Sequence, residues 1–200
     1  MRCNVICMCL LFITQLCISQ ENRHGLVLNG GLGKLNDVVP VHENLISEEA
    51  RFKYNLGLGY KVRIYNFKKP FFYDFDFSIG MKKCIYDYHN KIYDPDINPD
   101  PINHYVSEDI KLYYTSFNPT INYKIYRNLF LGVGLEPTIY YKANTSIKFD
   151  SPATFKIGYD HKFIGWAFIY KYGLFNTLDI SDNISKGKMN DVAVQLFIHF

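Results

Sequence analysis

The sequence predicts an all-β protein, an eight-stranded, antiparallel, up-and-down transmembrane β-barrel. Three observations support this prediction. Eight segments alternate between apolar and other side chains with a period of two, which is typical of strands that have two different faces. Tyrosine (17 residues) and phenylalanine (16 residues), both strand-favouring, are heavily used. The connections between the segments alternate between short and long, which indicates a meander with two unlike ends.

The composition indicates a single domain. A length of 200 residues fits one domain. A net charge of +3 gives no reason to expect a nucleic-acid partner.

The N-terminal residues have the pattern of a secretory signal peptide. Arg2 precedes an apolar run at residues 5–16, and small residues lead to a cleavage site between Ser19 and Gln20. A membrane anchor is the alternative, but the run is shorter than the ~20 residues that a spanning helix needs. We expect residues 1–19 to be a signal peptide and residues 20–200 to be one outer-membrane barrel domain. Only Cys84 then remains, so no internal disulfide is expected.

In most of the eight segments, one face is bulky and the other is small, polar or charged. The predicted strands cover residues 25–35, 52–65, 71–86, 110–126, 129–142, 153–160, 163–174 and 191–200. The last is the clearest, because Val192, Val194, Leu196, Ile198 and Phe200 alternate with Asp191, Ala193, Gln195, Phe197 and His199.

The fourth segment is the least regular. Its alternation blurs near Tyr113 and Tyr114. Pro119 removes one hydrogen-bond donor from the ladder, so we expect a bulge or local break there.

The connections predict which end of the barrel is which. Short turns are expected at residues 66–70, 127–128 and 161–162, and long loops at 36–51, 87–109, 143–152 and 175–190. In a meander, all the short turns then lie at one end. This is the pattern of an outer-membrane barrel with short periplasmic turns and longer external loops.

Volume decides which face points outward. An eight-stranded barrel has an interior barely filled by its own side chains, and the aromatic face that includes Trp166 and Phe168 would overfill it. Glycines such as Gly57 and Gly132 lie on the other face, where space is short. The bulky face should therefore contact lipid, whereas a soluble lipocalin-like barrel, the alternative, would invert the faces.

The inward face should then be charged, with eight cations facing five anions. The predicted inward charges are Lys53, Lys61, Arg63, Lys82, Lys124, Lys142, Lys156 and Lys171, with Asp74, Asp76, Glu136, Asp160 and Asp191. Paired charges can persist in such an interior, and water or further partners would balance the excess.

Two patterns in the sequence could mark functional sites, and the first is a series of oxygen-bearing side chains. Oxygen-bearing side chains recur at Asp94, Asp96, Asn98 and Asp100, as in the first half of a calcium loop. Pro99 replaces the required glycine and Tyr105 the final glutamate, so a stiff polar loop is the better interpretation and we assign no metal.

Histidines raise the question of catalysis. His89 and His104 lie in one predicted external loop with Ser107 nearby, but no spacing dictates a triad. We predict no catalytic residue, no cofactor and no enzymatic activity. His199 should face inward and form hydrogen bonds in the lumen.

Three stretches resemble a known family: INYKIYRNLFLGVGLEPTIYY, FIGWAFIYKYGLFN and the last strand that ends on Phe200. They are similar to the outer membrane β-barrel domain common in Bacteroidetes, the PorT-like family, whose architecture is similar to that of OmpA- and OmpX-type barrels. The resemblance covers residues 110–200 and, more loosely, residues 25–109. It implies an outer-membrane location and recognition of the last strand by the barrel insertion machinery.

These observations predict a structural and binding platform for external loops. Its expected partners are outer-membrane lipid, the insertion machinery and an extracellular or periplasmic protein. The charged lumen suggests a narrow pore as an alternative, although side chains should plug it. The PorT-like resemblance implies a second alternative function, that of an accessory barrel for protein secretion.

Overall fold

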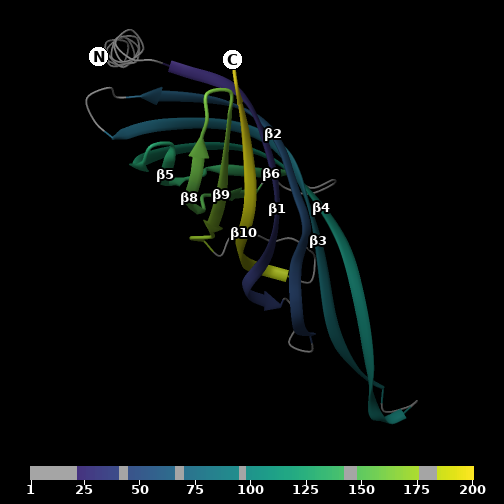
Figure 1. The fold of residues 1–200 in the computed structure, drawn as a ribbon. Coiled ribbons are helices and arrows are strands. Elements are labelled where there is room, and N and C mark those ends of the chain that lie inside the picture. Colours follow the sequence, from purple (N-terminus) through teal and green to yellow (C-terminus); the bar gives the residue numbers. More distant parts are fainter. Residues whose placement is uncertain (1–21, 41–44, 66–69, 95–97, 142–147, 176–183) are drawn as a thin grey trace, which may run out of the picture.

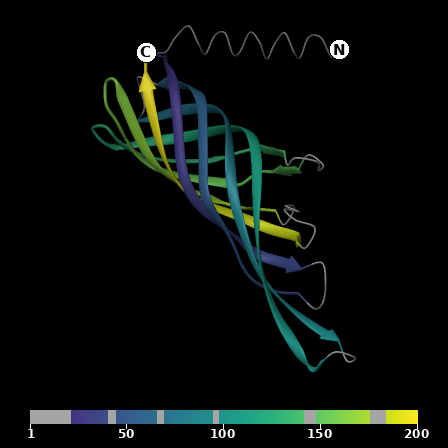
Figure 2. The same cartoon turned by 90° about the vertical axis from the view of Figure 1, so that its right-hand side faces the viewer.

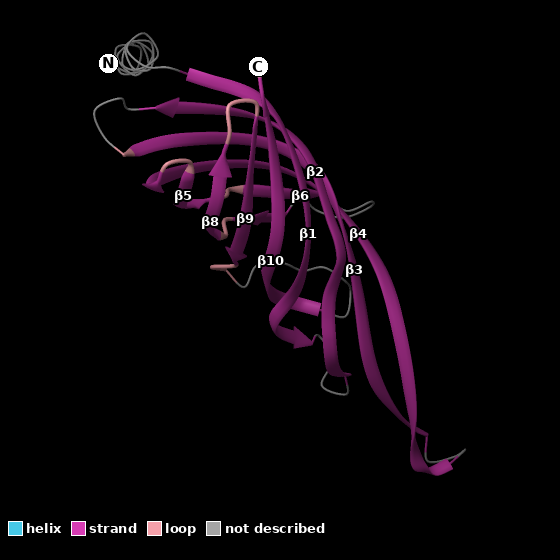
Figure 3. Cartoon of the chain, in the orientation of Figure 1, coloured by secondary structure: helices cyan, strands magenta, loops and turns pink. Residues whose placement is uncertain are grey.

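The computed structural model describes residues 22–40, 45–65, 70–94, 98–141, 148–175 and 184–200, and nearly all of them are strand (Figure 3). Their ten strands are β1 (Asn22–Pro40), β2 (Leu45–Tyr65), β3 (Phe71–Asp94), β4 (Asn98–Tyr126), β5 (Leu129–Leu135), β6 (Thr138–Tyr141), β7 (Lys148–Asp150), β8 (Ala153–Asp160), β9 (Ile164–Tyr172) and β10 (Ile184–His199). The predicted all-β fold is confirmed.

The strands close into one antiparallel barrel (Figures 1 and 2). Only Glu136 and Pro137 separate β5 from β6, and only Ser151 and Pro152 separate β7 from β8. Each of these pairs counts as one strand, which makes eight around the barrel. The pairing of β1 with β10 closes the ring. Closure leaves the barrel wall without a free edge, which lipid could not hydrogen-bond.

Side chains alternate between the lumen and the outer surface as predicted. In β10, Val192 and Val194 are exposed, whereas Asp191, Ala193 and Gln195 are buried. The same alternation holds along β9 and β8, with the aromatic and aliphatic side chains outside. The bulky face therefore points outward.

The predicted inward position of Lys53 is wrong, because β2 contains a β-bulge. Phe52 pairs with Cys84 and Tyr54 pairs with Lys83, so Lys53 is an extra residue with no partner on β3. A bulge of one residue reverses the faces beyond it. Phe52, which was predicted to point outward, is buried, and Lys53 is exposed.

The interruption expected at Pro119 lies on the neighbouring strand instead. β4 is continuous through Pro119 and stays paired with β3. The amide of Phe117 points to the opposite side, where it donates to the carbonyl of Pro137 at 3.0 Å. Alternation places residue 119 on that same side, where proline has no N–H to offer. The ladder of β4 with β5 and β6 accordingly lapses between Ser116 and Thr120.

Two of the predicted long loops are mainly paired strand. The prediction of a loop at 36–51 fails because β1 runs to Pro40 and β2 begins at Leu45. The prediction at 87–109 fails because β3 runs to Asp94 and β4 begins at Asn98. The predicted loops 143–152 and 175–190 likewise contain β7 and the start of β10. The β3–β4 hairpin reaches farthest from the barrel (Figure 1).

The two ends of the barrel differ, as predicted. β1 begins and β10 ends at one end, which we call the turn end (Figure 2). It also carries the turns at 127–128 and 161–162, and Arg127 has the positive φ (45°) of a tight turn. The other end, the hairpin end, carries the β1–β2, β3–β4, β6–β7 and β9–β10 hairpins. Most of the expected turn at 66–70 lies outside the described residues.

Candidate functional site

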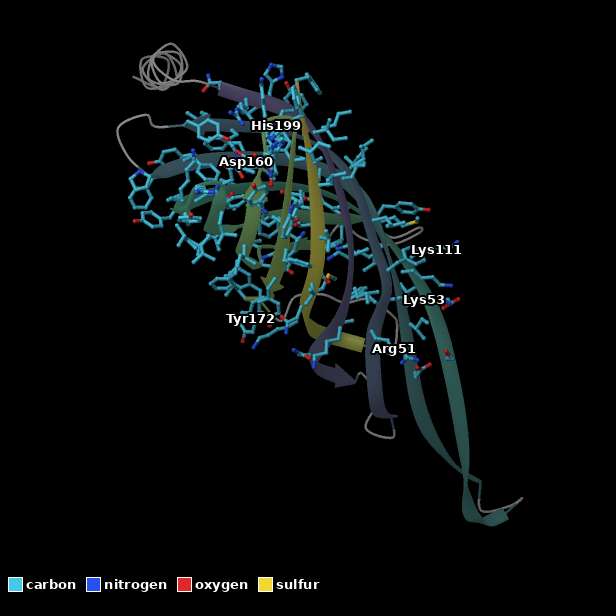
Figure 4. All side chains as sticks on the ribbon, in the orientation of Figure 1. Arg51, Lys53, Lys111, Asp160, Tyr172 and His199 are labelled. Carbon is cyan, nitrogen blue, oxygen red and sulfur yellow. The ribbon has the colours of Figure 1, made fainter. Side chains whose placement is uncertain are left out.

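The lumen at the turn end is filled by an ion-pair network around Arg63. Its Nε and Nη2 donate to the two carboxylate oxygens of Asp74, at 2.6 and 2.8 Å. Its Nη1 lies 3.0 Å from Oδ1 of Asp160. Nε2 of His199 lies 2.9 Å from the same Asp160 oxygen (Figure 4). His199 therefore faces the lumen, as predicted, and lies beside Asp160. The predicted hydrogen bonds are not formed with good geometry, because neither ring nitrogen has a hydrogen-bond partner among the described residues.

The network continues through the middle of the barrel. Nζ of Lys156 donates to Oδ2 of Asp76 at 2.8 Å. Nζ of Lys61 lies 3.5 Å from the carboxylates of both Asp76 and Asp74. Gln195, on the closing strand β10, donates to Asp76 at 3.3 Å. Lys61 and its two carboxylate partners lie on the neighbouring strands β2 and β3, whereas the contacts of Lys156 and Gln195 with Asp76 join strands that are not neighbours and therefore cross the lumen.

A second network lies toward the hairpin end. Nζ of Lys82 forms an ion pair with Asp191 and donates to the hydroxyl of Tyr140 at 3.2 Å. Nζ of Lys171 pairs with Glu136 at 2.7 Å. A buried hydrophobic cluster lies at this same end. It contains Leu35, Phe52, Cys84, Ile110, Leu112, Tyr114, Tyr140 and Met189.

The buried charges nearly balance, unlike the predicted set. Among the described residues, the buried cations are Lys61, Arg63, Lys82, Lys156 and Lys171, and the buried anions are Asp74, Asp76, Glu136, Asp150, Asp160 and Asp191. Lys53 is exposed on the outer surface, and Lys142 lies outside the described part. Lys124 is exposed, but it faces inward as predicted, because its Nζ lies 4.5 Å from the centroid of the buried Tyr65 ring. Sequence reasoning missed Asp150, because β7 is too short to show a period. Its one signal was that it follows Phe149, an outward residue.

These side chains block the lumen. The void bordered by Lys61, Arg63, Phe130 and Phe197 has no room for a water molecule. Glycines lie where the packing is tightest, as predicted: a Cβ on Gly158 would collide with the ring of Phe130. The interior is therefore a close-packed core of ion-paired and hydrogen-bonded side chains rather than a ligand pocket.

The β3–β4 hairpin has an open edge. Among the described residues, β4 from Asn98 to Leu112 pairs only with β3, because its ladder with β6 ends at Tyr113. Since the amide of Phe117 points toward β6, alternation turns the amides of residues 103, 105, 107, 109 and 111 toward the open side. Pro101 falls in the same series and offers no N–H, so the usable edge spans residues 103–111.

The predicted histidine positions are not brought into a pair. The backbone register sets His89 opposite Tyr105 and His104 opposite Asn90, one step apart along the hairpin. Ser107 is exposed and stands opposite Asp87. The backbone register therefore sets Ser107 opposite neither histidine.

The residues of the calcium-loop pattern lie at the tip of the same hairpin. The backbones of Asp94 and Asn98 pair there, and residues 95–97 lie outside the described part. Within the described ranges, no three His, Cys, Asp or Glu side chains gather in a way that could hold a metal. The same ranges contain no helix that is long and apolar enough to cross a membrane.

The fold and the two lumen networks define a class: a closed, internally filled, eight-stranded antiparallel barrel with an apolar outer surface. No family model and no curated protein matches the chain, so the PorT-like resemblance stays a prediction. Among solved structures, the chain is similar to Neisserial surface protein A (NspA), with 9% identity and a TM-score of 0.46. It is also similar to Ail, the attachment invasion locus protein of Yersinia pestis, with 11% identity and a TM-score of 0.44 in a complex with the heparin analogue sucrose octasulfate. Each match covers 90% of this chain and 99% of the other.

Proposed function

We propose that this chain is an integral outer-membrane protein whose sealed barrel is a structural and binding platform, without enzymatic activity. The outward face is the observation that carries the proposal. Ile79 is 62% exposed, Phe77 54% and Trp166 42%, and similar side chains surround the barrel. An apolar surface of this extent is costly in water and favourable in lipid.

The difference between the ends supports an orientation. Outer-membrane barrels place short turns in the periplasm and long connections outside. The turn end would therefore face the periplasm, and the hairpin end would face the exterior. The β3–β4 hairpin, which extends farthest, would be the most accessible part of the protein.

The open edge of β4 supports a mode of binding. Unpaired backbone amides along residues 103–111 can accept an extended segment of another protein as an added strand. The filled lumen supports a platform rather than a pore, because the Arg63–Asp74 and Lys156–Asp76 pairs would have to break before ions could pass.

Cell fractionation, together with thiol labelling of variants that each gain one exposed cysteine, tests this proposal. Ser107→Cys places a thiol on the hairpin, and Lys162→Cys places one at the turn end; both positions are exposed. The native Cys84 is buried, so its background reaction should be low. A membrane-impermeant maleimide should label Ser107→Cys on intact cells and Lys162→Cys only after the outer membrane is permeabilised.

A heat-modifiability gel provides the control for folding. The barrel should fractionate with outer membranes, remain folded in cold SDS and change mobility on boiling. Recovery in the aqueous fraction without detergent, or labelling of Lys162→Cys on intact cells, would contradict the proposal.

A further inference from the structure

Five cations form a row on the outer surface where the sheet leaves the barrel. This basic row consists of Lys34 on β1, Arg51 and Lys53 on β2, Lys83 on β3 and Lys111 on β4. Figure 4 shows Arg51, Lys53 and Lys111 along one flank of the molecule. Four neighbouring strands span about 14 Å, so a single headgroup can contact several of these cations.

The register gathers like charges rather than separating them. Lys83 stands directly opposite Lys111, an arrangement that is unfavourable unless an anion offsets it. The β-bulge adds Lys53 to this surface, whereas an unbroken strand would turn it into the lumen. The bulge therefore increases the positive charge of the row.

Carboxylates neutralise only part of the row. Asp109 lies 2.6 Å from Nζ of Lys83, and this hydrogen bond raises the pKa of the Lys83 ammonium. Asp87 lies 3.7 Å from Arg51. Among the described side chains, the remaining cations Lys34, Lys53 and Lys111 have no ion-pair partner. The row therefore has unneutralised positive charge.

An apolar groove lies directly beside the row on the membrane side. Its volume is about 760 Å³, and its wall is formed mainly by Leu28, Leu56, Leu58, Ile79, Met81 and Tyr113. The backbones of Gly57 and Gly80 also border it. A Cβ on either glycine would point inward against the buried ring of Tyr114, so the outward side chains of the neighbouring residues form the groove.

The groove and the row adjoin each other along the strands. Met81 pairs with Tyr113 in the groove, and the next pair on the same face is Lys83 with Lys111. Two residues of a strand advance by about 7 Å. The cations therefore lie as close to the groove as the headgroup of a lipid lies to its acyl chains. An apolar pocket that ends at clustered cations fits a molecule with hydrocarbon at one end and anions at the other.

We propose that the groove and the basic row together bind a phosphorylated glycolipid of the outer leaflet, with an acyl chain in the groove. Its phosphates would lie against Lys53 and Lys111, which have no ion-pair partner among the described side chains, with Arg51 and Lys83 beside them. This inference rests on the proposed function, which places the hairpin end and hence the row at the outer surface of the membrane. Arg and Lys bind phosphate through charge-assisted hydrogen bonds, and Arg does so with two parallel donors. A zwitterionic phospholipid offers the row no net charge.

Titration of the purified, folded barrel in uncharged detergent micelles tests the site. The probes are diphosphorylated lipid A, its dephosphorylated form, inorganic phosphate and heparin. Lysine-to-glutamine changes at Lys53 and Lys111 together should weaken lipid A binding by roughly fivefold for each charge removed. The matched control is Arg127→Gln with Lys162→Gln, which removes two exposed charges at the turn end and should leave lipid A binding unchanged.

A second variant tests the groove without altering charge. Thr115 is exposed and borders the groove, so Thr115→Trp should fill it. Lipid A affinity should fall, and mobility on the heat-modifiability gel should be unchanged. Equal lipid A affinity in the wild type and the Lys53/Lys111 double variant would overturn the inference, as would equal affinity for dephosphorylated lipid A. Heparin or free phosphate binding as tightly as lipid A would also overturn it.

The lipid site and the proposed function can fail independently of each other. A chain that fractionates with outer membranes but shows no preference for lipid A keeps its proposed function and loses this site. A chain recovered in the aqueous fraction loses the proposed function, whatever the micelle titration shows.

Discussion

The same two strands, β3 and β4, behave differently inside the barrel and beyond it. Within the barrel, β4 pairs with β3 on one side and with β5 or β6 on the other. Beyond Tyr113, the described part of β4 pairs with β3 alone. In lipid an unpaired backbone group costs several kcal/mol, whereas water satisfies it. The barrel must therefore be complete, and the hairpin can keep an edge free for a partner.

The largest expected effect is on the barrel interior. Arg63→Met should remove the bidentate partner of the buried Asp74 and a cationic partner of Asp160, and reduce the free energy of unfolding by about 3–5 kcal/mol. Equilibrium unfolding in urea, with the barrel in lipid vesicles, measures this. Lys83→Met breaks an ion pair on the outer surface and should have little effect. Equal losses from the two variants would show that the lumen network is not a buried core.

A smaller effect is expected from added volume. Gly158→Ala places a Cβ against the ring of Phe130 and should cost about 1–3 kcal/mol of unfolding free energy. Gly30→Ala is the matched control, because a Cβ there meets nothing within 4 Å. The same unfolding experiment compares them. A neutral Gly158→Ala would mean that the lumen has space to spare.

The smallest expected effect is on the hairpin. Glu108→Pro removes an amide that points toward β3 and should cost about 1 kcal/mol, the net worth of one hydrogen bond. Ser107→Pro removes an amide that points to the open edge and should leave the β3 ladder intact. The rates of amide hydrogen exchange across residues 87–112 distinguish the two proline variants. Faster exchange in both variants would show that the edge is already occupied.

The sequence predicted the barrel well and the hairpin poorly, and the apolar outer face of the barrel is the reason. Where one face of a strand is apolar and the other is polar, alternation is strict, so the outward Phe77 and the inward Asp76 could both be assigned. Along residues 87–109 the sequence has no such alternation, and a paired strand without an apolar face resembles a loop. The β-bulge at Lys53 left no signal, since its neighbours continue the alternation.

The interior was predicted only in part. Inward positions such as Arg63, Asp74 and His199 followed from the period of two. Their partners did not, because pairs such as Lys82 with Asp191 join strands that only barrel closure brings together. The basic row and the groove could not be predicted for the same reason: each is assembled from several strands, and no strand contributes more than three residues to either.

Amide exchange along β4 of the wild-type protein in lipid nanodiscs tests the central contrast most directly. In the barrel, the amides of Ile121 and Tyr123 point toward β5 and should exchange slowly. In the hairpin, the amides of Ser107, Asp109 and Lys111 should exchange fast, while those of Glu108 and Ile110, which point toward β3, stay protected. Slow exchange at all five hairpin positions would contradict an open edge, and fast exchange at Ile121 and Tyr123 would contradict a closed barrel.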